Sequence, residues 1–318
     1  MAVKFPAPLR SGDRVGVTSP SKGVEHRERD RLEQAVRAVR DRGYDVVIGE
    51  CMDGTAHTSA PAEERAAELM AMLTDPRIRA VVPPRGGETA IDLLPLLDWA
   101  SVAAADPTWF VGFSDISTLL LPMTLRTGIA TLHTNNLMNT PYKLAGQDGR
   151  VLTWPDIIAF SGGTSFTQGG RWVRLDGDGP ADVTGRLVGG CIEAVHHLAG
   201  TPHGDVARFA RQHAPEGLIV YLEAAGDDAF SVCRSLHGMR LAGFFAEVKA
   251  ILVASTLAPD SPTLSQEQAV VDALARVGVP IIAGVGCGHV PPYVPMVNGA
   301  LGHLRFGTGP ATLTQSLR

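Results

Sequence analysis

Three side chains, Ser114, Glu223 and His289, have the chemical types that a hydrolytic triad requires, and each lies just beyond an apolar run of the sequence. An imidazole, with an ordinary pKa of about 6.5, can take the proton of a serine hydroxyl near neutral pH. A carboxylate can hold the imidazole in the required tautomer and stabilise the imidazolium. These residues are therefore candidates for nucleophile, base and orienting acid, provided that the fold brings them together.

The segment Gly112-Phe-Ser-Asp lies where an apolar run gives way to a helical pattern. At such a turn the hydroxyl of Ser114 stands beside a helix N-terminus, and the N–H of Asp115 can donate to an oxyanion. Gly87, in Arg85-Gly-Gly-Glu, is the candidate for a second donor, because a glycine turn exposes its N–H groups to a ligand. Taken alone, each segment also fits a plain helix cap or a glycine turn.

The sequence contains few signs of metal or cofactor chemistry. There is no His-Glu-x-x-His, no Cys-x-x-Cys and no Walker A lysine motif. Gly284-Val-Gly-Cys-Gly resembles part of a dinucleotide fingerprint, but Pro291-Pro follows where a phosphate-binding helix would begin, which weakens the alternative of a nucleotide-dependent oxidoreductase. We therefore expect neither a metal nor a cofactor. The four cysteines lie far apart and are expected to be reduced thiols.

The charge balance limits the classes of partner. The 318 residues carry 28 basic and 33 acidic side chains, a net charge of −5, and 45% are hydrophobic. This composition argues against disorder and against an electrostatic nucleic-acid or membrane-surface binder. Two prolines interrupt the first ten residues, and no apolar run approaches the ~20 residues that span a bilayer. The expected protein is soluble and cytoplasmic.

Apolar periodicity predicts an alternation of strands and helices, and hence an α/β fold with mostly parallel sheets covered on both faces. The predicted strands are 14–19, 45–48, 78–82, 109–113, 218–222, 250–254 and 280–284, with short β segments within 296–313. The predicted helices are 28–42, 61–73, 88–97, 114–125, 192–198, 229–241 and 266–277. Glycine-rich turns between them divide the chain into an N-terminal domain (1–145), a connection (146–184) and a C-terminal domain (185–318).

Several segments in a fixed order give a more specific signal than any one motif. They are Pro8-Leu-Arg-Ser-Gly-Asp-Arg-Val-Gly-Val-Thr-Ser-Pro-Ser, Arg85-Gly-Gly with Leu93-Leu-Pro-Leu-Leu-Asp, Gly112-Phe-Ser-Asp, Gly185-Arg-Leu-Val-Gly-Gly, Leu222-Glu, Arg234 with Leu236, Val279-Pro-Ile-Ile and Gly288-His. With them, the chain resembles over nearly its whole length the LD-carboxypeptidase family of serine peptidases. That family includes muramoyltetrapeptide carboxypeptidases and the microcin C immunity peptidase.

The resemblance implies a Ser-Glu-His triad of Ser114, Glu223 and His289, with oxyanion donors from the backbone of Asp115 and Gly87. It also implies a flavodoxin-like, parallel-sheet N-terminal domain that carries the nucleophile. A second, smaller α/β C-terminal domain would supply the glutamate and the histidine. Finally, it implies a homodimer.

Three positions depart from the family pattern. Cys191 stands where relatives commonly have Asn after Gly-Gly, Ala224 replaces the Asp that commonly follows the glutamate, and Thr134-Asn-Asn replaces a Gly-Pro. Cys191 is therefore a candidate substrate-binding residue whose contact differs from that of relatives. These changes affect expected specificity more than the triad.

The expected function is serine-type hydrolysis of an amide bond near the free end of a small peptide-like substrate, first an L-D bond of cell-wall-derived peptides. The second candidate is cleavage of peptidyl- or aminoacyl-nucleotides, for which Trp172 could stack on a base. An alternative from another class is a non-catalytic peptide- or sugar-binding protein.

Overall fold

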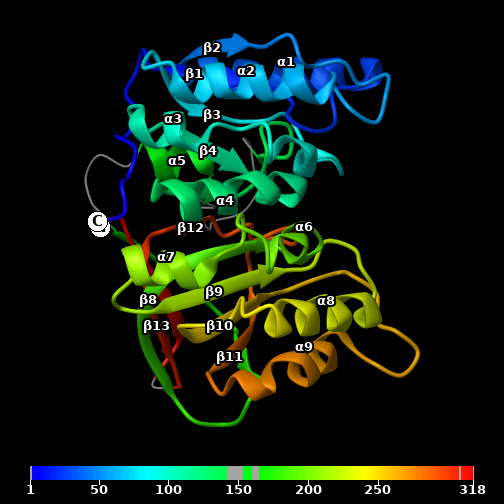
Figure 1. Cartoon of the computed structure of the whole chain (residues 1–318), viewed down its shortest axis with the longest axis vertical. Coiled ribbons are helices and arrows are strands. Elements are labelled where there is room, and N and C mark those ends of the chain that lie inside the picture. The colour runs from blue at the N-terminus through cyan, green and yellow to red at the C-terminus, as the bar shows by residue number, and fades with distance from the viewer. Residues whose placement is uncertain (1, 142–152, 160–164, 308, 318) are drawn as a thin grey trace.

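The computed structural model describes residues 2–141, 153–159, 165–307 and 309–317, which form two lobes, each built on one β-sheet (Figure 1). The sheet of the N-terminal lobe has six strands and that of the C-terminal lobe has eight. Both have helices packed on them, so the α/β fold class predicted from the sequence is confirmed. Within the described ranges, no helix combines the length and the apolar character needed to cross a membrane.

The N-terminal sheet has the order β12-β5-β4-β3-β1-β2, and its first five strands in the chain are parallel. They are β1 (Arg14–Val17), β2 (Asp45–Ile48), β3 (Ile78–Val81), β4 (Trp109–Gly112) and β5 (Thr131–His133). The order 2-1-3-4-5 is that of flavodoxin-like sheets, as predicted. Ligands of such folds bind beyond the carboxyl ends of the strands.

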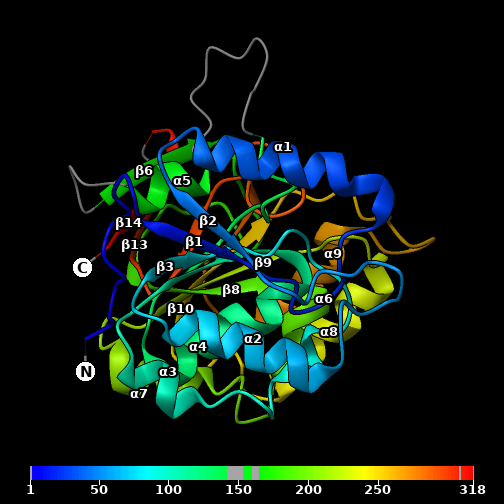
Figure 2. The ribbon, with the colours of Figure 1, turned by 90° about the horizontal axis from the view of Figure 1, so that it is seen from above.

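Helices cover both faces of the N-terminal sheet. They are α1 (Arg29–Arg40), α2 (Ala62–Thr74), α3 (Trp99–Ala104), α4 (Ser117–Thr127) and α5 (Trp154–Ile158). Figure 2 shows α1 and α5 on one side of the strands and α2, α3 and α4 on the other. In α1 the buried residues are Ala35, Val36 and Val39, whose spacing places them on one helix face.

The C-terminal sheet has the order β6-β14-β13-β8-β9-β10-β11-β7. Its central strands β8 (Ala181–Cys191), β9 (Leu218–Glu223), β10 (Val248–Ala254) and β11 (Ile281–Val285) are parallel. The outer strands β6 (Ser165–Gly170), β7 (Val173–Arg174), β13 (Leu301–Phe306) and β14 (Ala311–Ser316) are antiparallel to their neighbours. The accompanying helices are α6 (Ile192–Val195), α7 (Val206–His213), α8 (Ala229–Leu241) and α9 (Gln266–Leu274).

One strand crosses between the lobes. β12 (Met296–Asn298) follows β11 in the chain but pairs antiparallel with β5 of the N-terminal sheet, with Met296 opposite His133. The core is correspondingly continuous, since buried side chains of both lobes form one contiguous cluster. The lobes are therefore joined by backbone hydrogen bonds as well as by packing.

The region expected as a connection, 146–184, contains more structure than its sequence suggests. It holds α5, both edge strands β6 and β7 and the start of β8, while residues 146–152 and 160–164 lie outside the described ranges. The side chains of β6 are half-buried or exposed. A short edge strand of this kind carries no sustained apolar period, so the turn-rich composition dominates its sequence signal.

The predicted helix 88–97 is wrong in its extent. The structure has a 3-10 helix, η2 (Ala90–Leu93), followed after Pro95 by α3, which begins beyond the N-cap Asp98. Proline disfavours helical conformation at the residue before it and lacks the N–H that a continuing helix needs. The apolar spacing therefore spans two short elements instead of one helix.

Candidate active site

Ser114 lies at a sharp turn between β4 and α4. Its φ is +60°, one of three positive values among non-glycine residues in the described chain. Left-handed backbone is strained for a residue with a Cβ and is typical of a nucleophile at a strand-to-helix turn. Gly112 makes the turn tight, because a Cβ there would lie 2.7 Å from Oδ1 of Asn136 and 2.8 Å from Cγ2 of Ile116.

The Arg85-Gly-Gly turn packs against Ser114 through Gly86. A Cβ on Gly86 would lie 3.0 Å from Cβ of Ser114 and 3.4 Å from the backbone N of Asp115. Gly87, selected from the sequence as the second donor, packs against the 21–22 loop, where an added Cβ would lie 2.7 Å from the backbone N of Lys22. Within the Gly-Gly pair singled out from the sequence, it is therefore Gly86 and not Gly87 that packs against Ser114.

The Asp115 side chain fastens these loops together. Its Oδ2 accepts hydrogen bonds from the hydroxyl of Ser21 at 2.5 Å and from the backbone N–H of Ala90 at 2.9 Å. The Ser21 hydroxyl oxygen in turn accepts the N–H of Thr89 at 3.1 Å. The carboxylate therefore holds the turn of Ser114 against the loop after β3.

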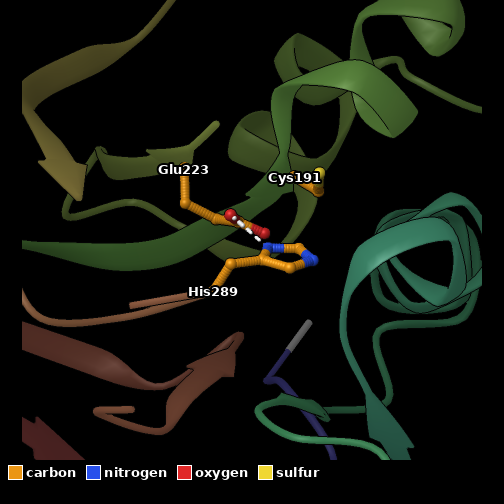
Figure 3. Close-up of side chains that lie close together, drawn as sticks. All are labelled: Cys191, Glu223 and His289. Carbon is orange, nitrogen blue, oxygen red and sulfur yellow. Dashed lines mark hydrogen bonds and ion pairs between the residues drawn. The ribbon is translucent and has the colours of Figure 1, made fainter. Parts of the chain in front are cut away.

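Glu223 and His289 meet at the carboxyl edge of the C-terminal sheet. Glu223 is the last residue of β9, and His289 lies in the loop after β11. Nδ1 of His289 donates to Oε2 of Glu223 at 2.8 Å, and the glutamate is 1% exposed (Figure 3). Burial opposes the imidazolium, but the hydrogen bond and the charge of Glu223 outweigh it and raise the pKa of His289. Gly288 permits this approach, since a Cβ there would lie 2.6 Å from Cδ of Glu223.

A second histidine, His133, approaches the same carboxylate and was missed by the sequence reasoning. It ends β5, is fully buried, and its Nε2 lies 3.7 Å from Oε1 of Glu223. Burial, with a smaller effect of His289, lowers the pKa of His133 to about 3, so this ring is neutral. Its position at the end of a parallel strand was the available signal.

The nucleophile candidate and the Glu-His pair converge from different lobes. The ring of Phe113, the residue before Ser114, lies 4.5 Å from that of His289 between ring centroids. Cys191, the residue of β8 paired in register with Glu223, lines one pocket together with Ser114. One donor atom each of Cys191, Glu223 and His289 lies within 4.8 Å of the other two.

That pocket, of about 390 Å³, is lined with carboxylates. Besides Ser114, Asp115, Gly87 and Cys191, it is bounded by Glu88, Glu193 and Asp227. Burial and neighbouring carboxylates, Asp115 for Glu88 and Glu193 for Asp227, raise the pKa of Glu88 and of Asp227. These carboxyl groups give the pocket an acidic lining.

Glu193, another residue missed from the sequence, is fixed in this pocket. Its Oε1 accepts the backbone N–H groups of Ala225, Gly226 and Asp227 at 2.7, 2.9 and 3.1 Å. Burial opposes ionisation, but these bonds and one from Cys191 prevail and lower the pKa of Glu193. The Cys191 thiol donates to its Oε2 at 3.1 Å, and burial followed by the charges of Glu223 and Glu193 raises the pKa of that thiol well above its ordinary value.

A larger pocket, of about 560 Å³, lies beyond the carboxyl ends of β9, β10 and β11. Its lining includes Ala224, Thr256 and Gly284 but none of the six residues selected from the sequence. Size alone is therefore a poor guide here, and the smaller pocket beside Ser114 holds the groups that can do chemistry.

Comparison with known proteins identifies the family of this chain. Residues 15–134 match the model of the LD-carboxypeptidase N-terminal domain, and residues 184–304 match that of the C-terminal domain. A putative carboxypeptidase of Streptomyces coelicolor is 30% identical over 97% of this chain and 95% of its own length. A murein tetrapeptide carboxypeptidase of Pseudomonas aeruginosa is 30% identical over 70% of this chain and 70% of its own length.

The solved structure of an MccF-like protein from Bacillus anthracis superposes with a TM-score of 0.82 at 19% identity, covering 99% of this chain and 100% of that one. The chain therefore belongs to the LD-carboxypeptidase family and is a serine-type carboxypeptidase.

Proposed function

We propose that Ser114, His289 and Glu223 form the catalytic triad of this hydrolase. The observation that carries the proposal is the 2.8 Å hydrogen bond between His289 and a fully buried Glu223, beside a serine held in left-handed backbone. Because Nδ1 of His289 donates to the carboxylate, Nε2 is the unprotonated nitrogen of the neutral ring. That nitrogen is the base that takes the Ser114 proton.

The reaction then follows in two halves. Ser114 Oγ attacks the scissile carbonyl carbon, and His289 Nε2 receives the hydroxyl proton and passes it to the leaving amine. The backbone N–H of Asp115 and an N–H of the glycine turn 86–87 stabilise the oxyanion, each such donor being worth roughly 10²–10³ in kcat. His289 next takes a proton from water, whose oxygen attacks the acyl carbon, and returns that proton to Oγ of Ser114 as the acyl–oxygen bond breaks and the carboxylic acid product leaves.

For the substrate, we propose a cell-wall-derived peptide that is cleaved at an L-D amide bond. Membership of the family supports this class, as does the 30% identity to a murein tetrapeptide carboxypeptidase. The alternative of a peptidyl- or aminoacyl-nucleotide loses one of its supports. Trp172, the candidate for stacking on a base, is 8% exposed and packs with its indole against Gly170, where a Cβ would lie 2.7 Å from Nε1.

A labelling experiment tests the nucleophile separately from the substrate. We expect a fluorophosphonate probe to label the native chain and the control Ser101→Ala, an exposed serine of α3, but not Ser114→Ala. Labelling that survives in Ser114→Ala, or is lacking in the native chain, would overturn the assignment and favour a binding protein. Mass-spectrometric assay with an LD-tetrapeptide and an aminoacyl-nucleotide in parallel then distinguishes the two substrate classes.

A further inference from the structure

Cys191, Glu223 and His289 form a compact set of metal-ligand types (Figure 3). β8 and β9 are parallel neighbours in which Cys191 and Glu223 are register partners, so both side chains emerge at the same sheet edge. His289 is added by the loop after β11, a strand that is parallel to β10 in the same sheet. Motif spacing gave no sign of this set, because the donors are far apart in the sequence: two end neighbouring strands and the third lies in the loop after β11.

The distances fit a small divalent ion after a modest adjustment. The three donor atoms lie within 4.8 Å of one another. Around a tetrahedral Zn²⁺, with bonds of roughly 2.0–2.3 Å, donors are separated by about 3.5 Å. Shifts of about 1 Å would therefore close the set around an ion. Thiolate, imidazole and carboxylate together are a donor set typical of zinc and its relatives and unlike that of Mg²⁺.

The surrounding charge also favours a cation. Oε1 of Glu223, in a side chain that is 1% exposed, makes no hydrogen bond with any residue in the described ranges. Glu193 lies beside Cys191, and Glu88 and Asp227 line the same pocket. A divalent cation would offset this negative charge. Entry is available, because Cys191 itself lines the pocket that contains Ser114.

We propose that Cys191, Glu223 and His289 form an inhibitory site for a thiophilic divalent cation such as Zn²⁺. On binding, the S–H bond of Cys191 breaks, a sulfur–metal bond forms and the proton leaves to solvent. The fourth coordination position stays open toward the pocket. Inhibition rests on the proposed function, since a coordinated His289 cannot take the proton of Ser114. The site depends on the thiol of Cys191.

Direct binding tests the site without any use of activity. The full-length chain is titrated with CoCl₂, which substitutes for zinc and gives a near-ultraviolet charge-transfer band when a thiolate is bound. We expect one Co²⁺ per chain with this band, displaced by ZnCl₂ but not by MgCl₂. Cys191→Ser, nearly isosteric, and Cys191→Asn should lose the band, whereas Cys233→Ser, a cysteine of α8 outside the set, should keep it. A native chain without the band, or a band that persists in both Cys191 variants, overturns the site.

Inhibition is then measured separately. Each variant's hydrolysis with ZnCl₂ is compared with its own rate in chelator. We expect the zinc concentration for half-inhibition to rise by at least about 10–100-fold in Cys191→Ser, since even the loss of an outer partner of a metal ligand costs that much affinity. Co²⁺ binding without zinc inhibition would overturn the inhibitory role. Co²⁺ binding by a chain that lacks hydrolase activity would leave the site standing and refute the proposed function.

Discussion

His289 and Glu223, 66 positions apart in the chain, are joined by a hydrogen bond of 2.8 Å in which the carboxylate is almost completely buried. Because water screens a buried charge weakly, the electrostatic attraction between the carboxylate and the imidazolium is stronger than it would be at the surface. The pair therefore fixes both the orientation of the ring and the pH at which it can accept a proton.

The first prediction concerns pH. Because the pKa of His289 lies above its ordinary value of 6.5, the base is protonated and inactive at low pH, and activity appears as pH rises through the raised pKa. We expect the acid limb of kcat/KM to have its midpoint above 6.5. Glu223→Gln should move that midpoint down and lower kcat by about 10³–10⁴-fold. A native midpoint below 6.5 would contradict the role of the pair.

The second prediction concerns the triad as a unit. Ser114→Ala and His289→Ala should each lower kcat by roughly 10⁴–10⁶-fold, and the double variant should be no slower than either. Single-turnover kinetics on a common substrate would measure this. Losses that add in the double variant would show that the two residues act in different steps.

A third prediction follows from the backbone of Ser114. Its φ of +60° suits glycine better than a residue with a Cβ. Ser114→Gly should therefore be more stable than Ser114→Ala by about 1 kcal/mol in urea unfolding. At Ser101, inside α3, the order should reverse, because alanine is favoured over glycine in a helix. If Ser114→Ala were as stable as Ser114→Gly or more stable, the left-handed turn would be unstrained.

The fourth prediction separates backbone strain from contact. Gly288 and Gly243 have φ of +81° and +78°, but only at Gly288 would a Cβ meet another residue within 4 Å, namely Glu223. Gly243→Ala should lose about 1 kcal/mol of stability, and Gly288→Ala should lose more than that because its methyl group also collides with buried Glu223. Only Gly288→Ala should also lose kcat, by about 10²-fold, because it displaces the carboxylate. Equal activity in the two variants would mean that the position of Glu223 tolerates such a shift.

A fifth prediction concerns specificity. Cys191 is buried beside Glu193 in the pocket of Ser114, and the family resemblance seen in the sequence leads us to expect asparagine at this position. We expect Cys191→Asn to change the ratio of kcat/KM between an LD-tetrapeptide and an aminoacyl-nucleotide more than it lowers either rate. An unchanged ratio across all substrates would remove Cys191 from substrate recognition.

The sequence carries local information well and long-range pairing poorly. Ser114, Glu223 and His289 could be selected because each follows an apolar run. Parallel strands of the C-terminal sheet bring Glu223 and His289 to one edge, whereas Ser114 comes from the other sheet. His133 and Glu193 could not be assigned, since the contact of His133 with Glu223 needs the register between the lobes and that of Glu193 needs three N–H groups more than thirty positions away. The prediction of one helix over 88–97 was wrong because apolar spacing alone does not reveal the helix break at Pro95.

Because β12 pairs with the sheet of the other lobe, the two halves of this enzyme cannot be separated cleanly. Since the segment Met296–Asn298 completes the sheet of the opposite lobe, a fragment that ends at residue 145 would leave the edge of β5 unpaired. Exposed strand edges recruit other chains, so that fragment should self-associate unless a peptide spanning the missing strand is supplied in trans. The two halves recognised by family models are accordingly not independent modules for gene fusion or domain exchange.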